Sequence, residues 1–506
     1  MFTHTCQYSF APHNFMYYFR FMSFSKDFAK DTIVYGLGRG IKKFIGIFLL
    51  PFYTRALSVD EYGVLETLST MTMLGAAFLS VGLDSAVGFY FFKAGEKERG
   101  RITYTLFVIR LLTFIPSIIP VLLSKQLSIA LFGTDEYVIP VAISSLLIPI
   151  SLLMDEQSKL LRYFHKPWLF SYSTILKSLV NVFLGITLVV WLSYGVTGSL
   201  TAQLFSSITV ILFTFFFFSV KKYDYNFSLM WAKKIFKFGF PVMWAGLAIW
   251  IMDSSDRFFL LHFSNLAEIG KYSIGNTFSQ PVLLLNMAIQ MSFSVLFFDF
   301  YYKEKDEKKP QSKVIAITGF KHYFAASLML SLLLSVFGKD IVPWVTTPEY
   351  TAGALAIPFL SFSHIAAQSY QTMSPGIIIS GKTWHFTWIT AVAASLNIIL
   401  NILLIPVCGF AGAATATFIS FFVYWVIKVI VAHKYFPIAY PFVKIFSTYL
   451  IFLILSTIIP YMEIRCGYNF SYIVHAAIIF SGFLTLKLMG FIKFETIRNL
   501  YKTFFG

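Results

Sequence analysis

Apolar runs of 18 or more residues recur along the whole of this 506-residue chain, and they constrain the fold more than any other feature. A run of that length crosses the hydrocarbon core of a bilayer, about 30 Å thick, as a single α-helix. The composition agrees, since 57% of the residues are apolar and only 13% are charged. No polar stretch between the runs is long enough for a soluble domain. We therefore predict an all-α polytopic membrane protein.

The apolar runs predict about 14 transmembrane helices. The expected segments are 33–55, 64–92, 102–124, 138–161, 169–192, 196–219, 241–263, 272–301, 314–337, 351–379, 385–406, 409–431, 439–460 and 471–492. The charge-free part of the first segment is too short to span a bilayer. It can cross only if it also takes in the basic residues that precede this part.

Basic residues are concentrated in alternate connections between the predicted helices, such as 93–101, 221–237 and 303–313. The positive-inside rule places these connections, and with them both termini, in the cytoplasm. The net charge of +16 is then explained by topology. We expect no nucleic-acid partner.

The two halves of the chain resemble each other. A Glu-x-Gly element at 61–63 recurs at 268–270, and a Gly-x-x-Gly element at 195–198 recurs at 409–412. The spacing between the copies is similar in the two cases, which predicts two six-helix lobes in the same orientation. Repeated lobes of this kind often place a substrate site at their interface.

The repeat suggests five parts. They are an N-terminal extension (1–25), an N-lobe with helices 1–6 (26–220), an amphipathic linker in the cytoplasmic interface (221–240), a C-lobe with helices 7–12 (241–436), and helices 13–14 with a cytoplasmic tail (437–506).

Three basic residues lie within the first predicted helix: Arg39, Lys42 and Lys43. They fall on one helical face about 100° wide. Charges inside a membrane are costly and usually face a cavity, an ion or a substrate. Such a face suits pyrophosphate or an acidic sugar, because arginine binds phosphate oxygens with two parallel hydrogen bonds. The alternative is that these side chains extend to the cytoplasmic interface.

The seventh predicted helix carries Asp253, Asp256 and Arg257. Asp253 lies about 18 Å along the helix from its expected start, near the middle of the membrane. Asp253 and Arg257 are spaced to pair within the helix, which leaves Asp256 without a local partner. We expect the two aspartates to bind a coupling H⁺ or Na⁺ or to line the cavity, and Arg257 to contact the substrate.

Asp84, in the second predicted helix, is a further candidate for cavity lining or ion coupling. It could instead pair with Arg39 or Lys43 in a structural role.

No pattern in the sequence predicts covalent chemistry. We find no phosphate-binding lysine loop, no metal-ligand spacing of His and Cys, and no nucleophile motif. We therefore expect no catalytic residue, no metal site and no cofactor, and a transporter rather than an enzyme.

Several motifs, taken together, resemble the polysaccharide-biosynthesis flippases of the multidrug/oligosaccharidyl-lipid/polysaccharide exporter superfamily. They are the run 48–57 leading into 60–63, GLDSA at 82–86, SSDR at 254–257 with ExGxY at 268–272, and NIILN at 397–401 with GFAGAA at 409–414. No single motif is diagnostic. Their order and spacing carry the resemblance from about residue 25 to 435.

The resemblance implies transport of an undecaprenyl-pyrophosphate-linked oligosaccharide across the bacterial plasma membrane by alternating access. The product would serve O-antigen, capsule or exopolysaccharide assembly, with a polysaccharide polymerase as a possible partner. An alternative is an ion-coupled exporter of small cationic drugs, which would favour an anionic cavity. A membrane polymerase or ligase would need large outer loops, and the predicted outer loops are short.

Overall fold

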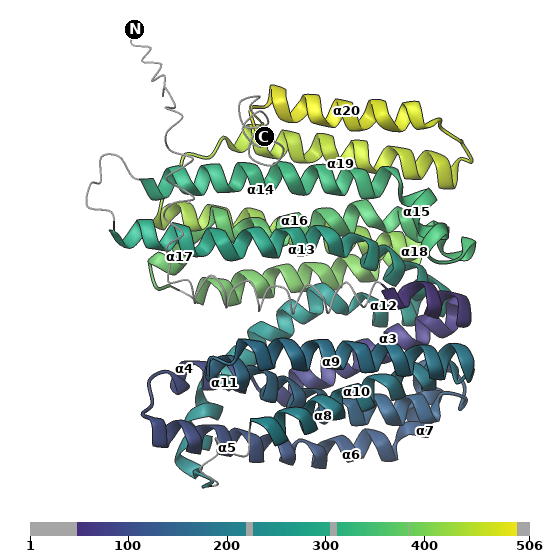
Figure 1. Cartoon of the computed structure of the whole chain (residues 1–506). Helices are drawn as coiled ribbons and strands as arrows, with labels where there is room; N and C mark the ends of the chain where they lie inside the picture. The colour runs from purple at the N-terminus through teal and green to yellow at the C-terminus, as the bar shows by residue number, and fades with distance from the viewer. Residues whose placement is uncertain (1–47, 219–225, 304–310, 383, 493–506) are drawn as a thin grey trace.

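The computed structural model describes residues 48–218, 226–303, 311–382 and 384–492. Within these ranges the chain is helical and contains no strand. The helices form two stacked bundles whose long helices run in roughly the same direction (Figure 1). We call them the N-terminal bundle, up to α10, and the C-terminal bundle, from α11 onward.

The N-terminal bundle begins with helical residues 48–56 at the end of the first predicted segment. Its other helices are α3 (Val59–Ser80), α4 (Leu83–Phe91), α5 (Glu96–Leu112), α6 (Phe114–Leu122), α7 (Ser124–Phe132), α8 (Val138–Tyr163), α9 (Pro167–Gly185), the π-helix η1 (Ile186–Trp191) and α10 (Gly195–Phe217). The start of α3 is fixed by a capping box, in which Ser58 and Glu61 bond each other's backbone N–H groups.

The C-terminal bundle contains the remaining helices. They are α11 (Leu229–Ser254), α12 (Asp256–Phe263), α13 (Leu266–Lys303), α14 (Gln311–Val336), α15 (Gly338–Val345), the 3₁₀-helix η3 (Pro348–Ala356), α16 (Ile357–Met373), α17 (Pro375–Ile379), α18 (Trp384–Tyr435), α19 (Phe442–Arg465) and α20 (Tyr472–Leu488). The continuous ribbon of α18 contains a non-helical Gly409, so it comprises two helices.

The predicted fold class, an all-α polytopic membrane protein, is confirmed. In the described part of the chain, 10 helices are long and apolar enough to cross a membrane, and the apolar helix α20 is shorter. The exact number of spans, about 14 from the sequence, stays a prediction.

The second predicted helix is broken in the structure. Val81 and Gly82 both have positive φ (46° and 64°), which ends α3 and starts α4. At this break α11 passes very close: a Cβ added to Gly239 would lie 2.5 Å from the backbone oxygen of Val81. Glycine at positions 82 and 239 therefore permits backbone-to-backbone packing between the bundles.

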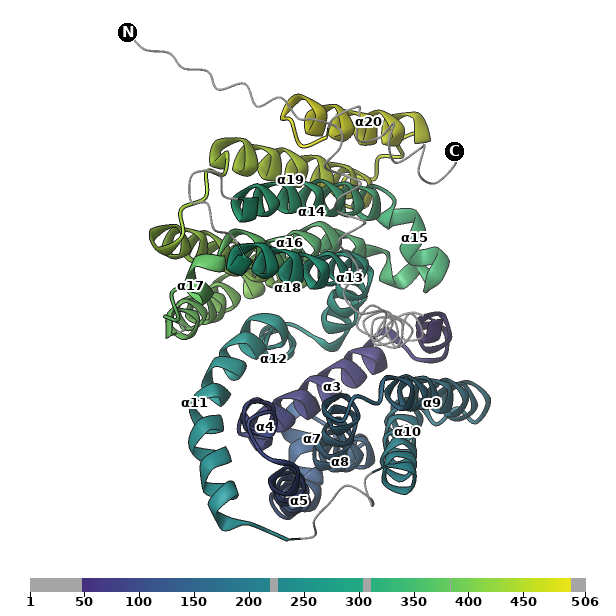
Figure 2. The same ribbon diagram turned by 60° about the vertical axis from the view of Figure 1, so that its left-hand side comes forward.

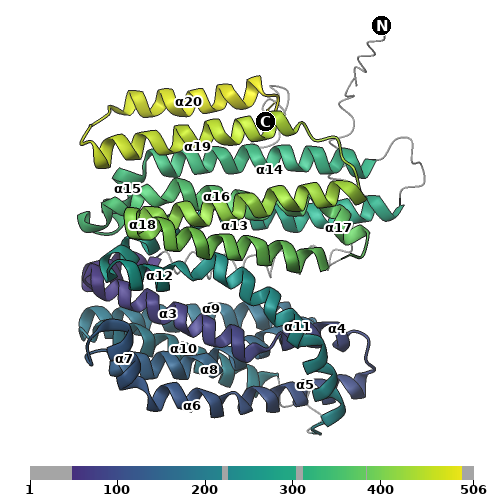
Figure 3. The same ribbon diagram turned by 180° about the vertical axis from the view of Figure 1, so that it is seen from behind.

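Helix α11 starts within the segment expected to be an interfacial linker and continues to Ser254. Its first turns pack on the N-terminal bundle, where Trp231 Nε1 donates to Glu98 and the Ser228 N–H donates to Thr105 Oγ1 at 3.1 Å. Farther along, α11 contacts α18 of the C-terminal bundle. The helix therefore runs along one side of the molecule and joins the two bundles (Figures 2 and 3).

Both copies of the Glu-x-Gly element meet the glycine turn of their own half. Glu61 Oε1 lies against Gly195, where a Cβ would be 3.4 Å away, and Glu268 lies against Gly409. The two glycines have nearly the same φ, 53° and 55°. Glu268 Oε2 also accepts a hydrogen bond from the backbone N–H of Phe410 at 3.0 Å. The same junction is therefore built twice in the molecule.

The bundles meet where α3 and α13 begin, and we call this the contact end. A Cβ added to Gly270 would lie 2.6 Å from the backbone oxygen of Val59, so the first turns of the two helices touch. The rings of Tyr62 and Tyr350 form a T-shaped pair with centroids 5.9 Å apart. Arg55 donates to the carbonyl oxygens of Trp344 and Val345, both at 3.3 Å. Three kinds of interaction therefore join the bundles at this end.

Candidate functional site

A cavity of about 330 Å³ lies between the bundles, next to the contact end, and we call it the pocket. Its walls come from helical residues 48–56, α3 and α10 of the N-terminal bundle and from α13 of the C-terminal bundle. The volume falls at the lower end of the range for small-molecule sites, about 300–1,000 Å³. The pocket is therefore placed where relative movement of the two bundles would change its access.

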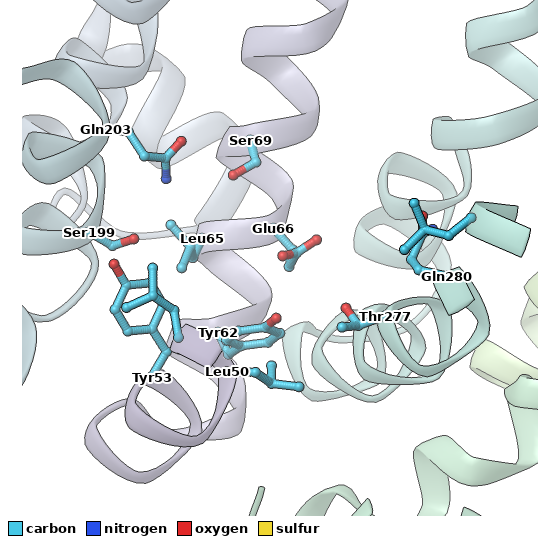
Figure 4. Close-up of a pocket in the computed structure, with 12 residues that line it drawn as sticks. Leu50, Tyr53, Tyr62, Leu65, Glu66, Ser69, Ser199, Gln203, Thr277 and Gln280 are labelled. Atoms are coloured by element: carbon cyan, nitrogen blue, oxygen red, sulfur yellow. The ribbon is translucent and has the colours of Figure 1, made fainter. Parts of the chain in front are cut away.

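Most of the side chains that line the pocket can form hydrogen bonds. The polar and aromatic members from the N-terminal bundle are Tyr53, Tyr62, Glu66, Ser69, Ser199 and Gln203. The C-terminal bundle contributes Thr277 and Gln280 from α13. Figure 4 shows the hydroxyl of Tyr53 pointing toward Ser199, with Glu66 on the side of α3 that faces Thr277 and Gln280. Leucine side chains complete the wall.

Arg257, expected to contact substrate, is buried (6% exposed) and is not among the residues that line the pocket. Its guanidinium lies over the ring of Tyr272, 4.9 Å from the centroid. It also interacts electrostatically with Glu66 and Tyr62 in the pocket wall. The structure therefore brings Arg257 close to the pocket, behind its lining.

The expected pairing of Asp253 with Arg257 takes a different form. Arg257 Nη1 donates to the backbone carbonyl oxygen of Asp253 at 3.2 Å, while the Asp253 side chain is exposed. Within the part of the chain that the structure describes, no ion pair of 4 Å or less joins these two side chains. The guanidinium therefore remains available to the charges around it.

Asp256 lies at the centre of a buried polar cluster between α12, α13 and α18. Its carboxylate accepts hydrogen bonds from Tyr272, from Asn401 Nδ2 at 2.7 Å and from Thr417 Oγ1 at 2.7 Å. Asn401 also donates to Asn397 Oδ1 at 3.2 Å. Asp256, Asn397 and Asn401 are fully buried. The partners that the sequence could not identify for Asp256 are thus polar side chains from distant segments.

This cluster has the chemistry of a small cation site. Hard cations such as Na⁺ prefer carboxylate, amide and hydroxyl oxygens, and the cluster contains groups of all three kinds. In this structure the Tyr272 and Thr417 hydroxyls and Asn401 Nδ2 donate to the Asp256 carboxylate, so a bound cation would replace these donated bonds. Asn401 Oδ1 is buried and, among the described residues, has no hydrogen-bond partner. A carboxylate in such a position can also take up a proton. The residues present therefore fit either coupling ion expected from the sequence.

Asp84 belongs to a different cluster, inside the N-terminal bundle. It pairs with Arg110 at 2.9 Å and with Lys159 at 2.7 Å, and Arg110 lies 3.9 Å from the buried Glu156. Arg110 and Glu156 are almost completely buried, at 0% and 1% exposure. None of the four lines the pocket between the bundles. This arrangement favours the structural role of Asp84.

Arg39, Lys42 and Lys43 lie outside the described residues, so their role as substrate-binding residues stays a prediction. The helix they precede reaches the pocket at Leu49, Leu50 and Tyr53.

The sequence reasoning missed Glu66. It is the one charged side chain among the described residues that line the pocket. The signal was present, because Glu66 lies inside the second predicted segment and an acidic residue within a membrane helix indicates a functional site. The amide residues Gln203 and Gln280 carry no such signal, since uncharged polar residues are common in membrane helices.

Comparisons with known proteins identify the family to which the chain belongs. A family model described as polysaccharide biosynthesis protein matches residues 52–352, more than half of the chain. A protein of the Lsg locus of Haemophilus influenzae is 22% identical over 329 residues, covering 63% of this chain and 77% of that protein. The succinoglycan biosynthesis transport protein ExoT of Rhizobium meliloti is 25% identical over 325 residues, covering 61% of this chain and 63% of that protein, less than two thirds of its length.

Solved structures show which fold the chain shares. The lipid II flippase MurJ in an inward closed conformation superposes with a TM-score of 0.67 at 17% identity, over 90% of this chain and 98% of that one. An inward-facing multidrug resistance transporter of the MATE family, in the MOP superfamily, superposes with a TM-score of 0.56 at 16% identity, over 80% of this chain and 94% of that one. At these identities the likeness concerns the fold.

Proposed function

We propose, from the premise that this chain belongs to the polysaccharide biosynthesis protein family, that it is a flippase for a lipid-linked oligosaccharide. The substrate is an undecaprenyl-pyrophosphate-linked sugar chain, moved across the bacterial plasma membrane for O-antigen, capsule or exopolysaccharide assembly. The observation that carries the proposal is the polar pocket between two membrane-embedded bundles. Such a pocket gives a hydrophilic head group an environment that the bilayer core lacks.

The proposed mechanism is alternating access. In this structure the bundles are joined at the contact end by the Arg55, Tyr62 and Gly270 contacts described above. Breaking those contacts would open the pocket at that end while the bundles approach each other at the other end. The substrate's sugar would cross through the pocket while its lipid chain stays in the bilayer.

Energy for the cycle would come from an ion bound at Asp256. Occupation of the site by Na⁺ or H⁺ changes the charge beside Arg257, which interacts with both Asp256 and Glu66. Ion binding in the C-terminal bundle would thereby alter the attraction of Arg257 for the wall of the N-terminal bundle. Positive charge from Arg39, Lys42 and Lys43 would attract the pyrophosphate.

The test is complementation of a deletion strain. Without the protein, lipid-linked repeat units should accumulate at the inner leaflet, and the wild-type gene should restore export. Arg39→Ala, Arg257→Ala and Asp256→Asn should each reduce export about tenfold or more at normal expression, whereas the exposed Asp340→Asn should not. If the deletion causes no accumulation, the flippase proposal is wrong. If all three variants retain full export, the assigned residue roles are wrong.

A second candidate is an ion-coupled exporter of small cationic molecules. Glu66 favours it, because a carboxylate in the pocket wall attracts cations. The same deletion strain separates the two proposals: an exporter would alter sensitivity to cationic drugs and leave lipid-linked sugars unchanged.

A further inference from the structure

We infer that Glu66 and the pocket amides select the sugar that enters this pocket, favouring neutral or amino-bearing sugars over uronic acids. The inference rests on the proposed flippase function and adds the chemical class of sugar. It concerns the pocket wall that the structure describes, which carries one carboxylate and no Lys, Arg or His.

The functional groups around Glu66 are those that bind uncharged sugars. Gln203 and Gln280 offer amide donors and acceptors, and Ser69 and Thr277 offer hydroxyls on either side of the carboxylate. Sugar hydroxyl and amino groups can donate hydrogen bonds to Glu66 and exchange further bonds with the amides. A bond that includes an ionised partner is about twice as strong as a neutral one. Glu66 is therefore expected to be the strongest single anchor for a hydroxyl or amino donor.

An acidic sugar meets the opposite situation. A uronic acid carboxylate has no proton to donate to Glu66, and the described wall holds no basic side chain to receive it. Like charges brought together in a low-dielectric site repel each other strongly. The pocket wall that is described here therefore disfavours an acidic sugar at this position.

The positive charge of Arg257 stabilises the negative charge of Glu66, but it does not change the preference of the pocket against acidic sugars. It interacts electrostatically with Glu66 but is 6% exposed and does not line the pocket. Its guanidinium stays behind the wall through its contacts with the Asp253 carbonyl oxygen and the Tyr272 ring. Substrate in the pocket would therefore meet the carboxylate of Glu66 and not the guanidinium.

The size of the pocket limits the selection to a small part of the head group. A volume of about 330 Å³ accommodates one or two sugar rings and not a whole oligosaccharide. Selection would thus act on a particular sugar, while other units of the chain remain outside the pocket.

The experiment measures lipid binding by the full-length protein in nanodiscs. The probes are undecaprenyl pyrophosphate linked to N-acetylglucosamine, the same lipid linked to glucuronic acid, bare undecaprenyl pyrophosphate, and undecaprenol. Wild type should bind the N-acetylglucosamine probe about tenfold more tightly than the glucuronic acid probe, as expected for one hydrogen bond to a charged group. Glu66→Gln should bring that ratio below about threefold.

Two further variants serve as controls for the effect of Glu66→Gln. Glu96→Gln removes an exposed carboxylate at the start of α5, a helix that contributes no residue to the described pocket wall, and should behave as wild type. Gln280→Leu should weaken binding of both sugar probes and leave their ratio near the wild-type value. If Glu66→Gln melts at the wild-type temperature and keeps the wild-type ratio, the inference is overturned. If no pyrophosphate probe binds wild type more tightly than undecaprenol, the proposed function itself fails.

Discussion

The side chain of Arg110 is fully buried and has its closest ion-pair partner in Asp84, at 2.9 Å. Removing one member of a fully buried pair typically costs on the order of 3–5 kcal/mol. The cost here should be smaller, because Asp84 is 29% exposed and Glu156 lies 3.9 Å from Arg110. We therefore expect Asp84→Ala to destabilise the protein, with Asp84→Asn having a smaller effect. Thermal unfolding of the purified protein in detergent measures both.

The matched control is Asp135→Ala. Asp135 pairs with Lys125 at 3.8 Å, but both side chains are about two thirds exposed, so this pair adds little. If Asp84→Ala and Asp135→Ala both have melting temperatures near that of wild type, the structural role of Asp84 is wrong.

Individual charged residues were found from the sequence more easily than their partners. Asp256 could be recognised as an acidic residue inside a membrane helix, but its partners Tyr272, Asn401 and Thr417 lie 16, 145 and 161 residues away. Helical spacing identifies neighbours only within a few turns. Such long-range pairs become visible only when the helices are packed.

At the scale of the helices, a substitution at Gly409 tests how much its junction with Glu268 stabilises the protein. Its φ of 55° and ψ of −135° fall in a region open essentially to glycine alone, and Glu268 packs directly against it. We expect Gly409→Ala to lower the free energy of unfolding by about 1–3 kcal/mol from the backbone alone. Displacement of the Glu268 cap from the Phe410 N–H should add to this loss.

Gly490→Ala is a suitable control, again followed by thermal unfolding. Gly490 also has positive φ (79°), but an added Cβ there meets nothing within 4 Å. The difference between the two variants therefore reports the contact with Glu268 together with the cost of the backbone conformation at Gly409. Equal losses of stability would show that neither the contact with Glu268 nor the backbone conformation at Gly409 makes this junction special.

Helix positions were predictable because apolar length decides them, and the expected segment 138–161 corresponds closely to α8 (Val138–Tyr163). The break at Val81 and Gly82 was not predictable. It depends on the close approach of Gly239 from another helix, which no local pattern records. The start of α11 at Leu229 was not predictable for a similar reason. Its polar first turns are stabilised by hydrogen bonds to Glu98 and Thr105.

At the scale of the whole molecule, a larger side chain at Gly270 tests whether the contact end closes the pocket. The Cβ of Gly270→Val would come within 2.6 Å of the Val59 oxygen, so the first turns of α3 and α13 must separate. We expect the population with an open contact end to increase. A membrane-impermeant maleimide should then label Ser69→Cys in the pocket at least about fivefold faster.

This measurement uses a background in which Cys6, Cys408 and Cys466 are replaced by serine. Gly246→Val serves as the control, because a Cβ at Gly246 in α11 meets nothing within 4 Å. Unchanged labelling in Gly270→Val, with a normal melting temperature, would contradict the role of the contact end as a barrier.

The fold class was predictable from apolar length, and repeated elements in the chain indicated repeated structure. The glycine turns and Glu-x-Gly elements that suggested two halves contact each other at Glu61 with Gly195 and at Glu268 with Gly409. The pocket was less predictable. Its wall combines Gln203 and Gln280 from different bundles, and their meeting depends on how the bundles are docked.

The attachment of α11 to both bundles limits how far they can move apart. A helix of 26 residues is about 39 Å long and resists stretching, since lengthening it would break its backbone hydrogen bonds. With one end held at Glu98 and the other packed on α18, it acts as an inextensible link. The bundles can pivot about this link but cannot dissociate on its side. In the proposed flippase cycle, the lipid tail of the substrate would therefore pass along the opposite side of the molecule.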